Sequence, residues 1–281
     1  MYKLNNFHTH SNFSDGSAAP VDYVEEAIRQ GFSSLGFSEH SVLPFENSFA
    51  LKPGSEISYI AEINRLRSEY KDQIKLHVAM EADYVPGISS GFVGLKQSFG
   101  LDYIIGSVHL VKTAHPEKLW FIDGPKRETY DNGLNEFFNG DIRQGVTAYW
   151  HQINQMLENE LFDIIGHLDK IKMHNQGRWF SEEDKWYTDQ VNETIDLIAE
   201  KGVIVEVNTR GIYKGRSQSL FPGEYILRKL SEKKIPVILS SDAHQPHELS
   251  LWFVEAKAVL KQCGINELCF LENAAWKKMA I

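Results

Sequence analysis

The sequence predicts an α/β fold, a closed or nearly closed parallel barrel formed as a single domain over residues 1–281. Three observations predict it. Short β-branched or aromatic runs alternate with helical patterns, which is typical of parallel strands joined by right-handed crossovers. About seven such units occur, and the length suits an α/β barrel of one domain. No linker, low-complexity tract or internal repeat interrupts the series.

Each predicted strand ends in a polar tip that usually carries a histidine. In chain order, the strands are expected at Leu4–His8, Ser34–Ser38, Lys75–Glu81, Tyr103–Val108, Asp163–Gly166, Val203–Val207 and Val237–Ser240. These runs are rich in the β-branched and aromatic residues that favour strands. The predicted sheet therefore has seven strands.

Helical spacing of apolar residues predicts the connections between the strands. The helices are expected at Val21–Gln30, Ile57–Tyr70, Arg143–Asn159, Ser181–Lys201, Pro222–Lys233 and Glu248–Cys263. The first follows Pro20 and ends at Gly31. Ser181 is expected to cap its helix, because carboxylates follow it at the positive end of the helix dipole. Residues 111–160 contain a less regular excursion that a minimal barrel does not need, expected to be a lid or an edge insertion.

The composition excludes several classes of protein. With 42% hydrophobic and 24% charged residues, the chain is typical of a globular protein that buries a real core. Its net charge of −9 and the absence of a basic run argue against nucleic-acid binding. No apolar stretch approaches about 18 residues, so no membrane span is expected. The chain begins without a signal-peptide pattern, and it has only two cysteines, Cys263 and Cys269. Both observations predict a cytoplasmic protein.

Polar residues with metal-binding side chains gather at the predicted strand tips. Six of the eleven histidines lie at or just beyond these tips, namely His8, His10, His40, His109, His167 and His244. Glu81 and Asp242 occupy equivalent positions, and Asp15 lies in the loop after the first strand. In a parallel barrel these tips open on one face, where catalytic residues gather. The sequence therefore predicts one site built from nine distant residues.

Two pairs of these residues share the same spacing. His8 and His10 lie two positions apart on an extended strand, so both imidazoles can project on one side and reach one ion. Taken alone, such a pair is equally compatible with two hydrogen-bonded histidines. Asp242 and His244 repeat the spacing on the last strand, which neighbours the first in a closed barrel. Two such pairs on neighbouring strands favour a metal site.

The remaining candidates have structural alternatives. Burying Glu81 at the end of an apolar strand would be costly without a partner, and a metal removes that cost. Its carboxylate can also bridge two ions. His109 and His167 would each be satisfied core residues if taken singly, but both follow an apolar run that contains a glycine, and this shared context favours ligands. Asp15 precedes Gly16 and is also compatible with a turn aspartate that binds its own backbone.

Two acidic residues lie beside proposed ligands without being assigned as ligands. Glu39 precedes His40, and Asp169 follows His167 by two positions. Either can orient an imidazole from behind. Glu39 is equally compatible with a position in the barrel core or against a neighbouring backbone.

The ordered set of residues from Phe7 to His244 resembles the polymerase and histidinol phosphatase (PHP) superfamily, and its length and spacing resemble the histidinol-phosphatase branch. The resemblance implies a distorted (β/α)7 barrel, a TIM-like fold with three divalent metal ions. It implies a first metal at His8, His10, Glu81 and Asp242, a second at Glu81, His109 and His167, and a third at Asp15, His40 and His244. Two positions depart from the family pattern: some members carry histidine where this chain has Asp15, and Asn6 replaces a usual acidic residue.

The resemblance implies hydrolysis of L-histidinol phosphate to L-histidinol and phosphate, a step of histidine biosynthesis. Nitrogen and oxygen ligands suit zinc, manganese or iron. The hypothesis for catalysis is that a hydroxide shared by the two metals that Glu81 bridges attacks phosphorus in line, while the alcohol leaves near the third metal. Asp242 and His244 are candidates to influence protonation of the leaving group. Both are also ligands, so no general acid is assigned.

An acidic protein that binds phosphate needs local positive charge. Arg210, after the sixth strand, is the first candidate to clamp the phosphate, and Arg178, after the fifth, is the second. Lys214 and Arg216 lie further along and are candidates for the same role. Each of these side chains is equally compatible with a solvated loop charge.

Three other functions remain compatible with the sequence. The chain can be a PHP-type phosphatase that acts on nucleotides or other small phosphoesters. It can be an amidohydrolase-type metal hydrolase, which also uses a histidine pair on the first strand and an aspartate on the last. It can also be a non-catalytic metal-binding protein. The favoured partner is a small phosphorylated substrate, with no nucleic acid and no membrane.

Overall fold

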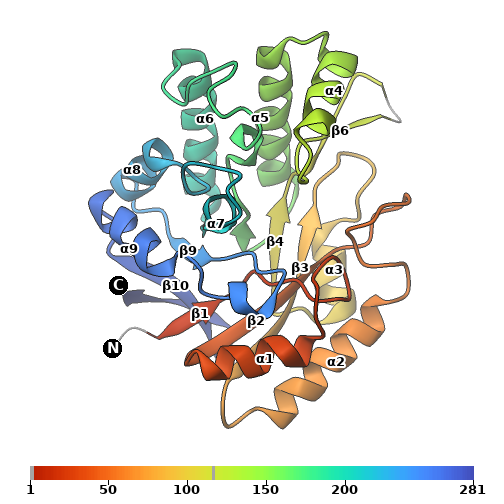
Figure 1. Ribbon diagram of the computed structural model, residues 1–281, viewed down its shortest axis with the longest axis vertical. Helices are drawn as coiled ribbons and strands as arrows, with labels where there is room; N and C mark the ends of the chain where they lie inside the picture. The colour runs from red at the N-terminus through yellow and green to blue at the C-terminus, as the bar shows by residue number, and fades with distance from the viewer. Residues whose placement is uncertain (1–2, 116–117) are drawn as a thin grey trace.

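The computed structural model describes residues 3–115 and 118–281. Seven parallel strands form one sheet in the order β1-β2-β3-β4-β7-β8-β9. These strands are β1 (Leu4–Asn6), β2 (Phe32–His40), β3 (Lys75–Asp83), β4 (Tyr103–Ser107), β7 (Ile164–Ile165), β8 (Ile204–Asn208) and β9 (Val237–Ser240). Every one overlaps a predicted strand. The structure confirms the predicted α/β barrel (Figure 1).

The barrel is nearly closed because β1 and β9 meet just beyond their ends. Thr9 and Ala243 form a parallel bridge. The backbone N–H of His10 donates to the carbonyl of Ala243 at 2.8 Å, and the N–H of Ala243 donates to the carbonyl of His8 at 3.2 Å. The buried amide of Asn6 also donates to the hydroxyl of Ser241 at 2.7 Å. These bonds place the His8–His10 pair beside the Asp242–His244 pair.

Helices surround the sheet (Figure 1). They include α1 (Pro20–Arg29), α2 (Glu56–Glu69), α3 (Phe92–Phe99), α5 (Ile142–Asn159), α6 (Lys185–Lys201), α7 (Arg210–Tyr213), α8 (Glu224–Glu232) and α9 (Phe253–Gln262), with short 3-10 turns at Lys170–Lys172 and Pro246–Glu248. Four of the six predicted helices agree closely with these bounds. The predictions that placed helix starts at Ser181 and Glu248 were wrong.

Local turns explain both corrections. Helix α6 begins at Lys185 with Asp184 at its N-cap, and the backbone N–H of Ser181 donates to the carboxylate of Asp184 at 3.2 Å. Ser181 therefore belongs to the preceding turn. Trp252 has a φ of 68°, in the left-handed region, and separates the 3-10 turn from α9.

The excursion predicted between residues 111 and 160 is a packed insertion followed by a crossover helix. An antiparallel hairpin of β5 (Leu110–Lys112) and β6 (Leu119–Phe121) leads into α4 (Arg127–Phe138), and α5 returns the chain to the barrel. Residues 116–117 of this range lie outside the described part. Buried Trp120 donates its indole N–H to the carbonyl of Tyr130 at 2.9 Å and so ties the hairpin to α4. Of these elements, α5 was predicted as the helix Arg143–Asn159, whereas the hairpin and α4 were not predicted.

A second antiparallel hairpin, β10 (Glu267–Glu272) and β11 (Ala275–Ala280), closes the end of the barrel where the strands begin. Its residues Cys269, Leu271 and Trp276 pack against the apolar residues inside the barrel. There the hydroxyl of Tyr103 donates to the carbonyl of Phe7 at 2.5 Å. A Cβ at Gly36 would lie only 1.9 Å from that hydroxyl, so the contact requires glycine. Because side chains fill the end of the barrel where the strands begin, a ligand site has room only at the carboxyl ends of the strands.

Neither cysteine forms a disulfide; Cys263 and Cys269 are both buried. Within residues 3–115 and 118–281, no helix combines the length and apolar character needed to span a membrane.

Candidate metal centre

The structure brings all nine predicted ligands together at the carboxyl ends of the strands. Their ligand atoms fall into four groups, and within each group all atoms lie within 4.8 Å of one another. These overlapping groups are His8, His10 and Asp242; Glu81, His109 and His167; His10, Asp15, His40 and His244; and His40, Asp83 and His109. The first three closely follow the three metal sites that the family resemblance implied. Asp83 is the one member of these groups that the sequence analysis did not name.

Glu81, at the end of β3, lies at the centre of these groups. One carboxylate oxygen, Oε2, lies 3.1 Å from Nε2 of His8, 3.4 Å from Nε2 of His10 and 3.2 Å from Nδ1 of His40. The other, Oε1, lies 3.0 Å from Nε2 of His167 and accepts the hydroxyl of Ser107 at 2.6 Å. Burial raises the pKa of Glu81, but the surrounding imidazoles lower it further, to well below its usual value. The two oxygens therefore face two different sets of histidines as an ionised bridge.

The donor set fits divalent cations. Nε2 of His8, both ring nitrogens of His10 and Nδ1 of His40 are buried without a hydrogen-bond partner among the described residues. Nε2 of His109 lies 3.0 Å from Nε2 of His167, and because Nδ1 of His109 lies against Asp83, a neutral His109 carries its proton on Nδ1 and presents the lone pair of Nε2 to the site. Buried polar atoms are normally paired. Cations among these nitrogens and carboxylates would satisfy them, and a set without thiolates suits zinc, manganese or iron.

Partners on the far side of the rings orient three of the histidines. Nδ1 of His109 lies 2.9 Å from Oδ1 of Asp83, and Nδ1 of His244 lies 3.0 Å from the carbonyl of Asp242. Nδ1 of His8 lies against Glu206. In each case Nε2 is left to face the site, as in metal centres whose histidines are held by a second group.

Sequence reasoning missed Asp83 and Glu206. Asp83 lies two residues after Glu81 and therefore on the same side of β3, a period-2 signal that was available. Glu206 interrupts an apolar run in β8, and such a buried carboxylate needs a partner.

Glu39 holds a loop, and within the described part of the chain its side-chain hydrogen bonds go to serines and to no imidazole. Its buried carboxylate accepts the backbone N–H of Ser11 at 2.9 Å and the hydroxyls of Ser11 and Ser14. These bonds shape the turn that carries Asp15, whose Oδ1 lies 3.1 Å from Nε2 of His244. Burial raises the pKa of Glu39.

Asp169, the other acidic neighbour of a ligand, also binds elsewhere. Its carboxylate lies 2.7 Å from Nζ of Lys172 and accepts the N–H of Gly223 at 2.9 Å. It thereby ties the segment after β7 to the start of α8.

Asp242 has an unusual backbone that its neighbours hold in place. Its φ of 51° lies in the left-handed region, which costs energy for a residue other than glycine. Its carbonyl accepts from Nη1 of Arg210 at 2.7 Å and from the hydroxyl of Tyr213 at 3.3 Å. The amide of Asn208 donates to its carboxylate at 3.3 Å. Arg210 thus both lines the site and fixes a proposed ligand.

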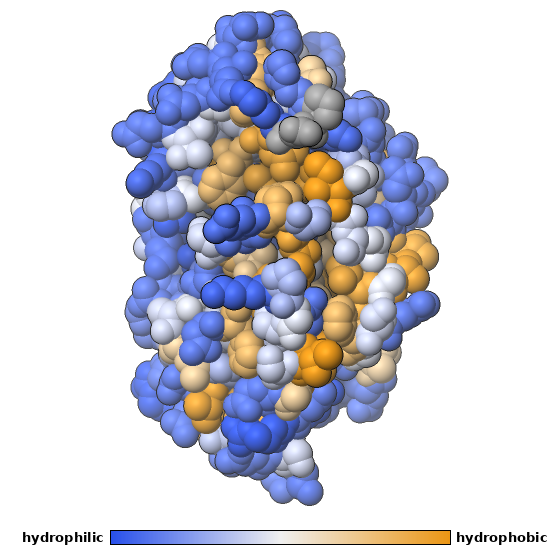
Figure 2. All heavy atoms as spheres, turned by 90° about the vertical axis from the view of Figure 1, so that its right-hand side faces the viewer, coloured by the Kyte–Doolittle hydropathy of each residue, from blue (hydrophilic) through white to orange (hydrophobic). Residues whose placement is uncertain are grey.

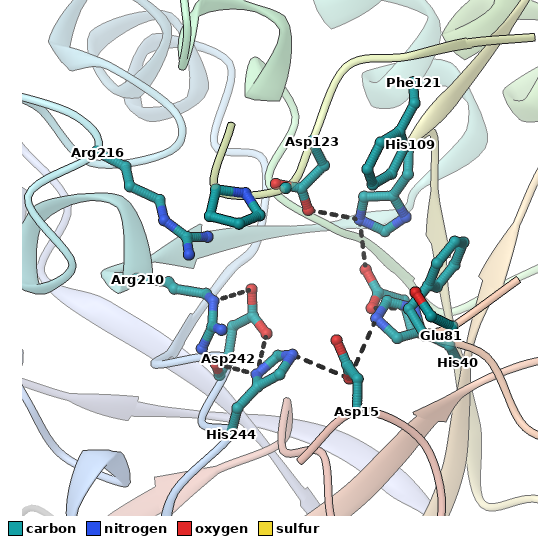
Figure 3. Close-up of a pocket in the computed structure, with 14 residues that line it drawn as sticks. Asp15, His40, Glu81, His109, Phe121, Asp123, Arg210, Arg216, Asp242 and His244 are labelled. Carbon is teal, nitrogen blue, oxygen red and sulfur yellow. Dashed lines mark hydrogen bonds and ion pairs between the residues drawn. The ribbon is translucent and has the colours of Figure 1, made fainter. Parts of the chain in front are cut away.

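A cavity of about 270 Å³ opens over this centre (Figure 3). Arg210 and Arg216 lie on one side, while His109 and Phe121 lie on the other. Arg210 was the first phosphate-binding candidate from the sequence, and Arg216 was named after it. The cavity therefore contains two cationic side chains next to the metal-binding groups.

The structure does not bring Arg178 or Lys214, the other two phosphate-binding candidates, to the described lining of this cavity. Two nitrogens of Arg178 lie 2.8 Å from the carboxylate of Asp131, and its guanidinium stacks 3.7 Å over the ring of Trp179. Nζ of Lys214 is bonded to buried Glu248. Each of the two cations is thus paired with a carboxylate that is also not part of the described lining.

One side of the cavity is apolar. Phe49, in the loop after β2, stacks on Phe121 of β6 with ring centroids 5.9 Å apart and an angle of 12° between the planes. Beside them, Leu43, Val85 and Leu110 form a small cluster. Figure 2 shows hydrophobic residues gathered in the middle of the face that looks toward the right-hand side of Figure 1. The site thus combines metal ligands, cations and an apolar wall.

Comparisons with known proteins agree with this geometry. The PHP domain model matches residues 6–210. A probable histidinol-phosphatase of Deinococcus radiodurans is 27% identical over 256 residues, which cover 90% of this chain and 91% of that protein. The histidinol-phosphatase of Bacillus subtilis is 25% identical, and the match covers 86% of this chain and 91% of that protein.

Two solved structures share the fold. The putative histidinol phosphatase of Listeria monocytogenes superimposes with a TM-score of 0.76 at 21% identity, covering 89% of this chain and 99% of that one. The histidinol phosphate phosphatase of Lactococcus lactis, which was solved with zinc, L-histidinol and phosphate, gives a TM-score of 0.69 at 22% identity, covering 98% and 99%.

Proposed function

The chain belongs to the PHP domain family, and from this premise we propose that it is a metal-dependent phosphatase that hydrolyses L-histidinol phosphate to L-histidinol and phosphate. The observation that carries the proposal is the shared cavity in which Arg210 and Arg216 lie beside the ligand groups centred on Glu81. A dianionic phosphate ester needs this combination. Relatives named histidinol-phosphatase that align over most of the chain, and the zinc, L-histidinol and phosphate bound by the Lactococcus lactis protein, support the choice of substrate.

We propose three metal sites. The first would be held by His8, His10, Glu81 and Asp242, the second by Glu81, His109 and His167, and the third by Asp15, His40 and His244. Zinc, manganese or iron in these sites would neutralise phosphoryl oxygens and lower the pKa of water at the centre. Asp242 and His244 would serve as metal ligands, and neither is assigned as a general acid.

The protein's own residues bind and orient the substrate. Arg210 and Arg216 donate hydrogen bonds to the phosphoryl oxygens, and the fixed fork of a guanidinium suits this task. Arg210 is also anchored to the carbonyl of Asp242, which fixes the phosphate relative to the ligands. The apolar wall at Phe49 and Phe121 excludes water from one side of the cavity.

The partner is then a small phosphorylated molecule and not nucleic acid, since the chain carries a net charge of −9. We propose that the whole chain works as one domain in the cytoplasm, where amino-acid biosynthesis takes place.

Phosphate release from a small panel of substrates tests the function. The panel contains L-histidinol phosphate, nucleoside monophosphates and p-nitrophenyl phosphate, each assayed with the metal-loaded enzyme before and after chelation. L-Histidinol phosphate should give the highest kcat/KM, and chelation should abolish turnover until zinc or manganese is returned. Glu81→Gln should lose activity and metal, whereas Glu232→Gln, on the exposed side of α8, should keep both. A preference for nucleoside monophosphates would instead make the protein a nucleotide phosphatase of the same family.

A further inference from the structure

One carboxylate in the cavity has no place among the proposed metal ligands. Four acidic side chains line the described cavity: Asp15, Glu81, Asp123 and Asp242. Three of them belong to the ligand groups. Asp123 comes from the insertion, two residues after the end of β6, and its side chain lies between the two arginines and Phe121 (Figure 3).

The two oxygens of Asp123 differ in their contacts with the described residues. Its Oδ2 lies 3.2 Å from Nζ of buried Lys170 and 3.9 Å from Nε2 of His109. Its Oδ1 is buried without a hydrogen-bond partner among the described residues. An ionised carboxylate accepts up to about four hydrogen bonds, so this group has unused capacity. The ammonium of Lys170, 3.2 Å from Oδ2, favours the ionised form of this carboxylate.

The surroundings of Asp123 favour a cation with an attached apolar group. The stacked rings of Phe49 and Phe121 form the wall beside it, and Pro125 also lines the cavity there. Arg210 and Arg216 supply positive charge on the other side (Figure 3). The cavity is therefore polarised: an anionic end of a ligand fits the arginines, and a cationic end fits Asp123.

We propose that Asp123 binds the ammonium group of the substrate and that Phe49 and Phe121 contact its carbon skeleton, so that the site selects aminoalkyl phosphates over phosphate esters without an amine. The inference rests on the proposed phosphatase function and extends it to the basis of substrate choice. Asp123 then determines specificity and holds no metal ion. Lys170 holds Oδ2 and keeps the carboxylate in place, while Oδ1 is buried and has no hydrogen-bond partner among the described residues.

Wild-type enzyme alone gives the first test. L-Histidinol phosphate is compared with 3-(imidazol-4-yl)propyl phosphate, which keeps the ring and the phosphate and lacks the amine. Loss of a hydrogen bond to a charged group lowers kcat/KM by between about 10-fold and about 150-fold. Equal kcat/KM for the two esters would overturn the inference, whatever a variant does.

Asp123→Asn gives the second test, with Asp189→Asn on the exposed side of α6 as the matched control. The variant should lose the preference for the amine, with kcat/KM for L-histidinol phosphate falling to the level of the amine-free ester and the latter changing by less than about threefold. L-Histidinol should bind the variant at least about 10-fold more weakly, while inorganic phosphate should bind as before. Metal content should match that of wild type and of the control.

Three results would count against the inference. If Asp123→Asn lowered kcat/KM equally for both esters, Asp123 would act in catalysis. If the variant lost bound metal, Asp123 would be a metal ligand. Unchanged discrimination would remove it from recognition. If the single variant does not fold because Lys170 is left buried and unpaired, the double change Asp123→Asn with Lys170→Met removes both charges and answers the same question.

The failure of this inference is distinguishable from a failure of the proposed function. Should L-histidinol phosphate not be hydrolysed, 2-aminoethyl phosphate and ethyl phosphate form a second matched pair. If wild type preferred 2-aminoethyl phosphate and Asp123→Asn removed that preference, the amine-binding role of Asp123 would be supported, although L-histidinol phosphate would be rejected as the substrate. Absence of any preference in both pairs would overturn the subsite.

Discussion

Nδ1 of His8 lies 2.5 Å from Oε1 of Glu206, although the two residues are 198 positions apart in the chain. The other oxygen of Glu206 accepts the backbone N–H of His167 at 2.8 Å. One buried carboxylate on β8 therefore fixes the ring of one proposed ligand and the backbone of another. Burial raises the pKa of Glu206, but its histidine neighbours lower it further, so its charge is retained.

Glu206→Gln should weaken zinc binding by about 10- to 100-fold, because an amide keeps the shape but loses the charge that orients His8 and strengthens its donor atom. Competition with a chromophoric chelator measures the change. Glu232→Gln, on the exposed side of α8, is the matched control and should bind zinc like wild type. Equal affinities for Glu206→Gln and wild type would show that Glu206 has no part in metal binding.

Removal of metal should destabilise the fold. A cation at 100 times its dissociation constant stabilises the folded state by about 2.7 kcal/mol, and for a protein of this size that corresponds to a Tm change of roughly 5–10 °C. The cause is the set of buried nitrogens around Glu81 that lose their partner when the cation leaves. Thermal unfolding followed by circular dichroism, before and after chelation, measures the difference. Identical Tm values would contradict a built metal centre.

Arg216→Ala should raise KM for phosphate esters by between about 10-fold and about 150-fold, since a hydrogen bond to a charged group is lost, and should leave metal content unchanged. Arg210→Ala should raise KM and also reduce metal affinity, because Arg210 holds the carbonyl of Asp242. Arg178→Ala should leave KM as it is, since Asp131 binds that guanidinium. Steady-state kinetics with metal analysis separates the three variants, and an unchanged KM for Arg210→Ala would remove it from phosphate binding.

Glu39→Gln should loosen the loop that carries Asp15 and reduce occupancy of the third metal site alone. The amide can accept fewer of the bonds from Ser11 and Ser14 that the carboxylate now accepts. Elemental analysis should then show one metal ion fewer per chain, with the ions around Glu81 retained. Full metal content in this variant would show that the loop keeps its shape without the charge.

His77 should make stability depend on pH in acid. It is largely buried near the closed end of the barrel, with Nε2 lacking a hydrogen-bond partner among the described residues, and burial lowers its pKa to about 4. The unfolded chain binds a proton near pH 6.5 and the folded chain does not, so stability falls as pH drops from 6.5 to 4, by up to about 1.4 kcal/mol per pH unit. Urea unfolding of metal-free wild type and His77→Leu measures this; parallel pH profiles would exclude His77 as the source.

The positions of the strands and the nine candidate ligands could be predicted because both follow from local patterns. β-Branched runs such as Ile104–Ile105 and the spacing of His8 and His10 are visible in a single stretch of sequence. Helix boundaries were less accurate where a side chain competed with the helix, as Asp184 does for the N–H of Ser181. The charged loop residues were the least predictable, because nothing in the sequence shows that Asp131 binds Arg178 while Arg216 lines the cavity.

The sequence by itself determined the parallel barrel and the nine side chains that meet at its carboxyl end, because period and position along a strand decide which face a residue occupies. Only the tertiary structure decided which charges remain available. Asp131 and Glu248 hold Arg178 and Lys214, Asp83 and Glu206 orient the histidines, and the insertion brings Asp123 to the cavity. Pairing between distant charges depends on distances in space, and no spacing along the chain encodes them.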